Sequence, residues 1–185
     1  METMILGLAI FFAIHLLPSV PTLRNALFVK LGEKPYKGIY ALISFAGLYL
    51  VVTGKGEAGF IAVWEPLPWS YMVTNACMLL ALYCLVAMNM QSNLKRFTAH
   101  PMLWGISFWS LGHLFTNGDQ ASIVLFGSFL VYSLFAMFSA NRRGARPKGE
   151  RIPLRFDAMI AVISTVGYVV LANLHPYFAG VELVR

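Results

Sequence analysis

The sequence predicts an all-α integral membrane protein, a bundle of six transmembrane helices with both termini on the periplasmic side. Of its 185 residues, 58% are hydrophobic and only 12% are charged. The mean hydropathy is positive, which is outside the range of a soluble domain of this length. Apolar stretches of bilayer length recur along the chain, and the basic residues between them alternate as the positive-inside rule requires.

Six apolar stretches are expected to form the spans of one domain over residues 1–185. They cover about 3–20, 36–53, 69–90, 102–116, 120–140 and 156–174. The first is a retained span and not a signal peptide, because it carries Glu2, lacks a basic leader and contains His15. Asn117-Gly118-Asp119 is a turn signal between the fourth and fifth spans. The segment after Pro21 has the spacing of an interfacial helix.

The charges in the connections test this count independently. Twelve of the fourteen Lys and Arg residues fall on one predicted side: Arg24, Lys30, Lys34, Lys37, Lys95, Arg96, Arg142, Arg143, Arg146, Lys148, Arg151 and Arg155. Only Lys55 and Arg185 fall on the other. Basic connections stay in the cytoplasm, so both termini are predicted to lie outside.

The basic connection over 141–155 has two alternative interpretations, an anionic-lipid site or a nucleic-acid contact. It has no interleaved aromatic residues, and it contains Gly144, Pro147 and Gly149. A solvated cytoplasmic linker is therefore the preferred interpretation. We expect the lipid bilayer as a partner and no nucleic acid.

The four histidines fall into two pairs. His100 and His175 each precede a proline, which disfavours helical geometry and predicts a position at a helix boundary. His15 and His113 lie inside apolar stretches. His113 shares a helical stripe with Ser107, Ser110, Thr116 and Asn117. Such a stripe must face protein or ligand, because hydrocarbon offers its polar groups no partner.

His15 and His113 are candidate metal ligands. Their predicted depths agree to within roughly 10 Å at 1.5 Å per helical residue. Two imidazoles facing each other across a bundle typically hold a six-coordinate haem b. Without a Cys-x-x-Cys-His motif the haem would be non-covalent. Phe11, Phe12, Phe108 and Trp109 would suit its porphyrin.

Other interpretations stay open. Each intramembrane histidine could simply hydrogen-bond a neighbouring helix. Zinc is weaker, because no third ligand accompanies the pair at a useful spacing. An acid–base pair of His113 with Asp119 is possible, although capping of the next helix by Asp119 is preferred. Cys77 and Cys84 are expected to be buried, unbonded residues of one helix.

Several motifs resemble the NnrU family of membrane proteins. They are His100-Pro101-Met102-Leu103-Trp104-Gly105, Trp109, His113-Leu114, Asn117-Gly118-Asp119 and Leu125-Phe126-Gly127, with residues 12–19, 31–38 and His175-Pro176. The resemblance covers essentially the whole chain. It implies a multi-pass protein of the bacterial inner (plasma) membrane. The family takes its name from gene clusters for nitrite and nitric oxide reduction.

That family is similar to plant zeta-carotene isomerase, a membrane enzyme that holds haem b between two histidines. By motif position, the resemblance maps the two ligands to His15 and His113. Ala99 stands where the family often has arginine. If that cation meets a haem propionate, Arg96 or Lys95 must do so here.

The sequence therefore predicts a haem b protein linked to nitrite and nitric oxide metabolism, with a redox partner. One alternative is a haem-dependent cis-trans isomerase acting on a carotenoid-like, apolar polyene. Another is a haem-free membrane scaffold or small-solute carrier. The site candidates are His15 and His113 as ligands and Trp109 and Arg96 as cofactor contacts. His100, Asn117, Asp119 and His175 are further candidates, and whether the protein is an enzyme is left open.

Overall fold

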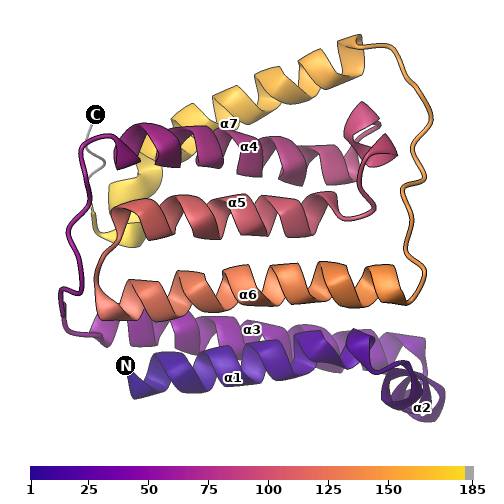
Figure 1. Ribbon diagram of the computed structural model, residues 1–185. Coiled ribbons are helices and arrows are strands. Elements are labelled where there is room, and N and C mark those ends of the chain that lie inside the picture. Colours follow the sequence, from indigo (N-terminus) through magenta and orange to yellow (C-terminus); the bar gives the residue numbers. More distant parts are fainter. Residues whose placement is uncertain (182–185) are drawn as a thin grey trace. The chain divides into compact units, whose positions relative to one another are not determined.

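The computed structural model describes residues 1–181, which form seven α-helices and two short 3-10 helices (Figure 1). The elements are α1 (Glu2–Leu16), η1 (Leu17–Ser19), α2 (Pro21–Leu31), α3 (Glu33–Glu57), α4 (Ser70–Asn89), η2 (Asn93–Arg96), α5 (Pro101–Thr116), α6 (Gln120–Arg142) and α7 (Arg155–Ala179). Over these residues the only extended pairing is an isolated bridge between Ala62 and Asp119. The all-α prediction is confirmed.

Five helical stretches are long and apolar enough to cross a membrane: Glu2–Ser19, Glu33–Glu57, Ser70–Asn89, Gln120–Arg142 and Arg155–Ala179. The stretch predicted as the fourth span is α5, which has only 16 residues. At 1.5 Å per residue it is about 24 Å long, shorter than a hydrocarbon core of about 30 Å. Six spans and the orientation of the termini therefore stay predictions. Arg185, assigned to the outer side by the charge count, lies outside the described residues.

Two helices extend beyond their predicted boundaries. α3 covers Glu33–Glu57, several residues more at each end than the predicted 36–53. α7 continues through Pro176 to Ala179, so His175 lies inside the helix and not after its end. The helix ends at Gly180, whose φ of 70° is left-handed. Glycine adopts this conformation without steric cost, so it stops the helix where the His-Pro pair does not.

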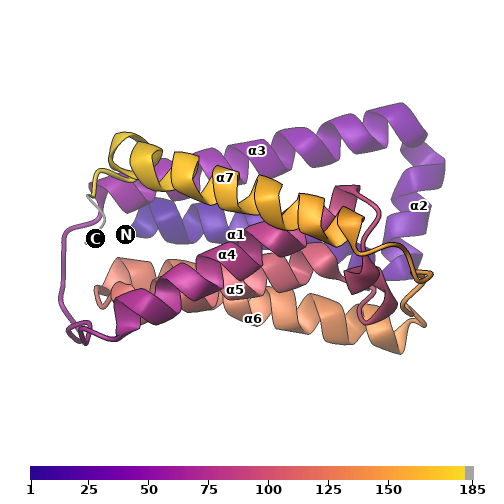
Figure 2. The same cartoon turned by 90° about the horizontal axis from the view of Figure 1, so that it is seen from above.

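The chain divides into two compact units, and the first comprises Met1–Val63 with Asp119–Ser128. In this unit α1 lies along α3, and α2 runs across their ends (Figure 2). Glycines permit the close approach of α1 and α3. A Cβ at Gly7 would come within 2.6 Å of the Val51 nitrogen, and one at Gly47 within 2.8 Å of the Phe11 nitrogen. The predicted helix after Pro21 is present as α2.

The second unit comprises Trp64–Gly118 and the chain from Phe129 onward. Its α5 packs against α4, and α7 also contacts α4. A Cβ at Gly112 would come within 2.9 Å of the Cys77 Cβ, so this interface also depends on small residues. Thr74 of α4 donates a hydrogen bond of 2.8 Å to the carbonyl of Gly112. Cys77 and Cys84 are buried and unbonded, as predicted.

Candidate functional site

His15 lies near the end of α1 in the first unit and is half-buried. Its Nδ1 lies 2.8 Å from the carbonyl oxygen of Phe11, four residues earlier. The imidazole stacks on the ring of Phe11 with centroids 3.9 Å apart and planes 21° apart. Tyr40 of α3 also lies near it, with a centroid distance of 5.3 Å and the planes 59° apart. The helix and these two rings therefore hold the imidazole in one orientation.

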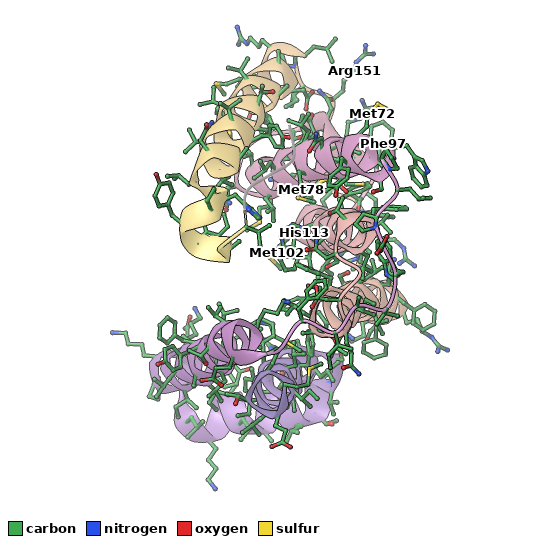
Figure 3. The ribbon with its side chains drawn as sticks, turned by 90° about the vertical axis from the view of Figure 1, so that its left-hand side faces the viewer. Met72, Met78, Phe97, Met102, His113 and Arg151 are labelled. Carbon is green, nitrogen blue, oxygen red and sulfur yellow. The ribbon has the colours of Figure 1, made fainter. Side chains whose placement is uncertain are left out.

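His113 lies in the last turn of α5 in the second unit (Figure 3). Its Nδ1 lies 2.8 Å from the carbonyl oxygen of Trp109, again four residues earlier. The Trp109 ring is 5.3 Å from the imidazole and meets the edge of Phe129 at 5.5 Å. The two intramembrane histidines thus share one local arrangement, an aromatic residue one turn back whose carbonyl binds Nδ1.

This shared arrangement has a chemical consequence. A carbonyl oxygen only accepts hydrogen bonds, so Nδ1 must be the donor in both rings. In the neutral imidazole the lone pair is then on Nε2, the atom through which histidine commonly binds a metal. Donation of the other N–H to a backbone carbonyl is the usual way in which a ligating histidine is oriented. His15 and His113 therefore each have the hydrogen bonding that is typical of a histidine that binds a metal through Nε2.

The role of Trp109 is more specific than the sequence suggests. We predicted it as an aromatic contact of a porphyrin, whereas the structure also gives its backbone carbonyl to His113. Phe11, also predicted as an aromatic neighbour of the porphyrin, has the same role toward His15. An aromatic residue four positions before each histidine is visible in the sequence, and this shared spacing is the signal that could have identified the pair.

The polar stripe predicted on α5 divides among different partners. Ser107 and Ser133 of α6 share a hydrogen bond of 2.8 Å, and both are buried. Ser110 is also fully buried. Asn117 donates its Nδ2 hydrogen to the carbonyl of His113 at 2.8 Å and thereby caps the end of α5. The Ser107–Ser133 bond therefore joins α5 to α6, whereas the Ser110 hydroxyl has no hydrogen-bond partner among the described residues. Asn117 stabilises the turn that carries His113.

Asp119 caps the next helix, as the preferred interpretation predicted. Its Oδ1 accepts a 3.0 Å hydrogen bond from the backbone N–H of Ser122 in the first turn of α6. The same oxygen lies 3.0 Å from the ammonium nitrogen of Lys55. Burial acts to raise the pKa of Asp119, but the hydrogen bonds from Ser122 and Lys55 outweigh it and lower that pKa below 3.8. The carboxylate is therefore engaged in structural contacts.

The two histidines that precede proline lie elsewhere in the second unit. His100 is the residue before α5, and its Nε2 lies 2.8 Å from Oδ1 of Asn141. His175 lies inside α7, and its Nδ1 donates to the carbonyl of Val181 at 2.8 Å. The residues four positions before them are Arg96 and Leu171, so neither histidine follows an aromatic residue by one helical turn. Both therefore differ from the intramembrane pair in local geometry.

Arg96 lies at the opposite end of α5 from His113. It is an exposed residue of η2, with its guanidinium carbon 5.6 Å from the ring centroid of Phe97. From Pro101 to His113 the helix rises by twelve residues, about 18 Å. A contact of Arg96 with a propionate of a cofactor held at His113 stays a prediction, and this separation weighs against it.

Sequence reasoning missed a polar cluster around Asp157. The Oδ1 of this carboxylate accepts hydrogen bonds from the Tyr83 hydroxyl, the Ser92 hydroxyl and the Asn93 backbone N–H at 3.0–3.1 Å. These donors are about 65 to 74 residues away, so no local pattern indicates them. In residues 1–181, no group of three or more His, Cys, Asp or Glu side chains is placed to hold a metal ion.

Comparison with protein families decides the identity of the chain. Residues 3–183 match the family described as NnrU protein, which is nearly the full length. The chain belongs to the NnrU family. Its apolar helices and this membership establish a membrane protein of the NnrU family. Neither the curated proteins nor the solved structures contain a match to this NnrU chain.

Proposed function

We propose that this NnrU protein binds haem b through His15 and His113 and serves in the metabolism of nitrite and nitric oxide. The observation that carries the proposal is the shared geometry of the two histidines. In each, Nδ1 donates to a carbonyl four residues earlier, at 2.8 Å in both cases. The lone pair of each neutral ring is then on Nε2, an atom through which histidine commonly binds a metal.

The residues around each histidine fit a haem ligand. The carbonyls of Phe11 and Trp109 hold the Nδ1 protons and so keep both imidazoles in the tautomer that binds iron. The Phe11 ring stacks on the His15 imidazole at 3.9 Å, and the Trp109 ring lies 5.3 Å from the His113 imidazole, so each ligand candidate packs beside an aromatic ring. Bound haem supplies one-electron chemistry and an iron position that nitric oxide can occupy.

The link to nitrogen oxides rests on membership of the NnrU family, whose name derives from gene clusters for nitrite and nitric oxide reduction. The absence of a Cys-x-x-Cys-His motif from the sequence fits a non-covalent haem b. A redox partner would deliver the electron. Two alternatives make different predictions: an isomerase turns over a cis-polyene on reduction, and a scaffold or carrier holds no haem.

The test is an absorption spectrum of the full chain, purified in detergent after expression with sufficient haem. We expect sharp reduced-state bands from about one haem per chain, lost in His15→Ala and in His113→Ala. The matched controls are His100→Ala and His175→Ala, which remove the same side chain outside the proposed pair and should keep the bands. A colourless wild-type preparation, or bands that all four variants retain, would overturn the proposal.

A second measurement separates loss of a ligand from loss of the fold. Free imidazole added to His15→Ala or His113→Ala should restore the reduced-state bands if the cavity left by the side chain admits it. Circular dichroism and gel filtration should show that each variant remains helical and monodisperse. With haem present, a nitric oxide-induced shift of the bands supports the nitrogen-oxide role, whereas turnover of a cis-carotenoid supports the isomerase.

A further inference from the structure

The basic connection after α6 forms one wall of a cavity in the second unit. The cavity has a volume of about 590 Å³ and lies where η2, the start of α5 and residues 145–149 meet. Its basic lining residues are Lys95, Arg146 and Lys148, with His100 beside them. Its volume is in the range of small-molecule sites, about 300–1,000 Å³. The sequence did not indicate that these segments meet.

The connection is largely exposed, as predicted for a solvated linker, but hydrogen bonds also hold it to η2. The Gly149 N–H donates to the carbonyl of Lys95 at 3.1 Å. A Cβ at Gly149 would lie 2.7 Å from the Arg96 nitrogen, so only glycine permits this approach. Asn93 binds Ile152 in both directions, with Nδ2 to the carbonyl at 2.9 Å and the N–H to Oδ1 at 3.1 Å. These contacts join the connection to η2 and fix the wall that the two segments form.

The charges of this wall are not neutralised by protein. In residues 1–181 the ion pairs are Lys37 with Glu33 and Lys55 with Asp119, both in the first unit. No acidic residue lines the cavity. Glu150 lines an adjoining cavity of about 290 Å³ that shares Lys95 and Gly149 with the first. The cavity therefore combines three cations with no carboxylate.

The start of α5 adds to this positive field. No side chain of the described residues caps the helix, whose first residue is Pro101. The first backbone N–H of this helix that forms a hydrogen bond is that of Trp104, which donates to the His100 carbonyl. The N–H groups of Met102 and Leu103 come before it, and both residues line the cavity. Unpaired amides and the positive end of the helix dipole favour an anion there.

The lining also includes apolar side chains, and these bear on which kind of anion the cavity would bind. Met88, Met102 and Leu103 line the cavity beside the cations (Figure 3 labels Met102). Phe97, in the same connection as Lys95, is 76% exposed. An apolar surface beside a cationic one suits a phosphate group that carries acyl chains better than a free, fully hydrated anion.

We propose that this cavity binds the phosphate group of an anionic phospholipid at the membrane surface. Lys95, Arg146 and Lys148 pair with the phosphate, and Met102 and Leu103 contact the lipid next to it. The site is separate from the histidine pair, so it does not depend on haem. A water-soluble phosphate shares the same chemistry, and the experiment distinguishes the two sources.

The test titrates the detergent-purified full chain with phosphatidylglycerol, phosphatidylcholine of the same acyl length, and inorganic phosphate, and measures bound ligand by native mass spectrometry. We expect phosphatidylglycerol to bind more tightly than phosphatidylcholine. The double variant Arg146→Ala, Lys148→Ala should weaken it at least about tenfold, since each cation near an anionic lipid contributes on the order of 1 kcal/mol. Added salt should weaken wild-type binding further.

The matched control is Arg142→Ala, Arg143→Ala, which removes the same charge from the same connection but not from the cavity lining. It should bind phosphatidylglycerol as the wild type does. Inorganic phosphate that binds equally well, and is lost only in the cavity variant, would confirm the phosphate site but overturn its assignment to lipid. Equal binding of both lipids, or equal weakening in both double variants, would overturn the site itself.

Discussion

In the first unit, the ammonium nitrogen of Lys55 lies 3.0 Å from Oδ1 of Asp119 and so joins the last turn of α3 to the start of α6. The pair is partly shielded, with the Asp119 side chain only 8% exposed and that of Lys55 32%. The carbonyl of Ile61 reinforces this junction by accepting the Gln120 N–H at 2.9 Å. One carboxylate thus serves both as a helix cap and as the partner of a distant lysine.

Replacement of Asp119 should separate these two roles. Asp119→Ala removes the cap and the ion pair and is expected to lower the free energy of unfolding by about 1–3 kcal/mol. Asp119→Asn keeps an oxygen that can cap α6 but loses the charge, so we expect a smaller loss. Denaturant titration of the detergent-solubilised protein measures both. Equal losses in the two variants would mean that the capping oxygen contributes nothing beyond the charge.

The stability of the protein should depend on pH through the ionisation of Asp119. The folded-state pKa of Asp119 is below its ordinary value of 3.8. A carboxyl of this kind stabilises the fold above its unfolded-state pKa and loses that contribution as the pH falls through the folded-state pKa. The difference in Tm between wild type and Asp119→Asn should therefore be constant well above pH 3.8 and shrink below it. Glu65→Gln, which removes an exposed carboxylate outside this junction, is the control substitution.

The contact between α1 and α3 should tolerate no side chain at Gly47. Its Cβ would lie 2.8 Å from the Phe11 nitrogen, a backbone atom that cannot move alone. Gly47→Ala is expected to destabilise the protein by about 1–3 kcal/mol through overpacking. Gly38→Ala, on the same helix but with nothing within 4 Å of its Cβ, should be neutral or stabilising by up to about 1 kcal/mol. Similar thermal stabilities for the two variants would contradict this close approach.

Asn93 should control the susceptibility of the basic connection to protease. Its side chain holds the backbone of Ile152 at 2.9 and 3.1 Å. Loss of these bonds in Asn93→Ala lowers the cost of local opening, so tryptic cleavage within 142–151 should accelerate roughly tenfold. Mass spectrometry of timed digests measures the rate. Gln91→Ala, an exposed neighbour, is the control, and equal rates in both variants would mean that Asn93 does not anchor the connection.

Local patterns predicted much of the fold because each depends on neighbours in the chain. Pro101 and Asn117 indicated the ends of α5, and Asp119 indicated the start of α6. Local patterns failed where a distant contact or a later residue decides where a helix ends. Proline was expected to end the last helix near His175, whereas the left-handed Gly180 ends it. Length also could not be judged from hydropathy alone, since α5 proved only 16 residues long.

For the candidate sites, the sequence separated His15 and His113 from the two histidines that precede proline, because their surroundings in the chain differ. It could not assign a donor atom to either ring, because that depends on which carbonyl each Nδ1 reaches after the helix forms. The basic cavity was beyond prediction, since Lys95, Arg146 and Lys148 meet only after the connection docks on η2.

The sequence by itself determined that this protein is a helical membrane protein of the NnrU family, because hydropathy, charge distribution and family motifs are properties of the chain. Only the tertiary structure decided that Asp119 pairs with Lys55, that Asp157 gathers Tyr83, Ser92 and Asn93, and that the cations around His100 share a cavity. These contacts join residues about 50 to 74 positions apart. Such contacts depend on how the helices pack, which no local pattern encodes.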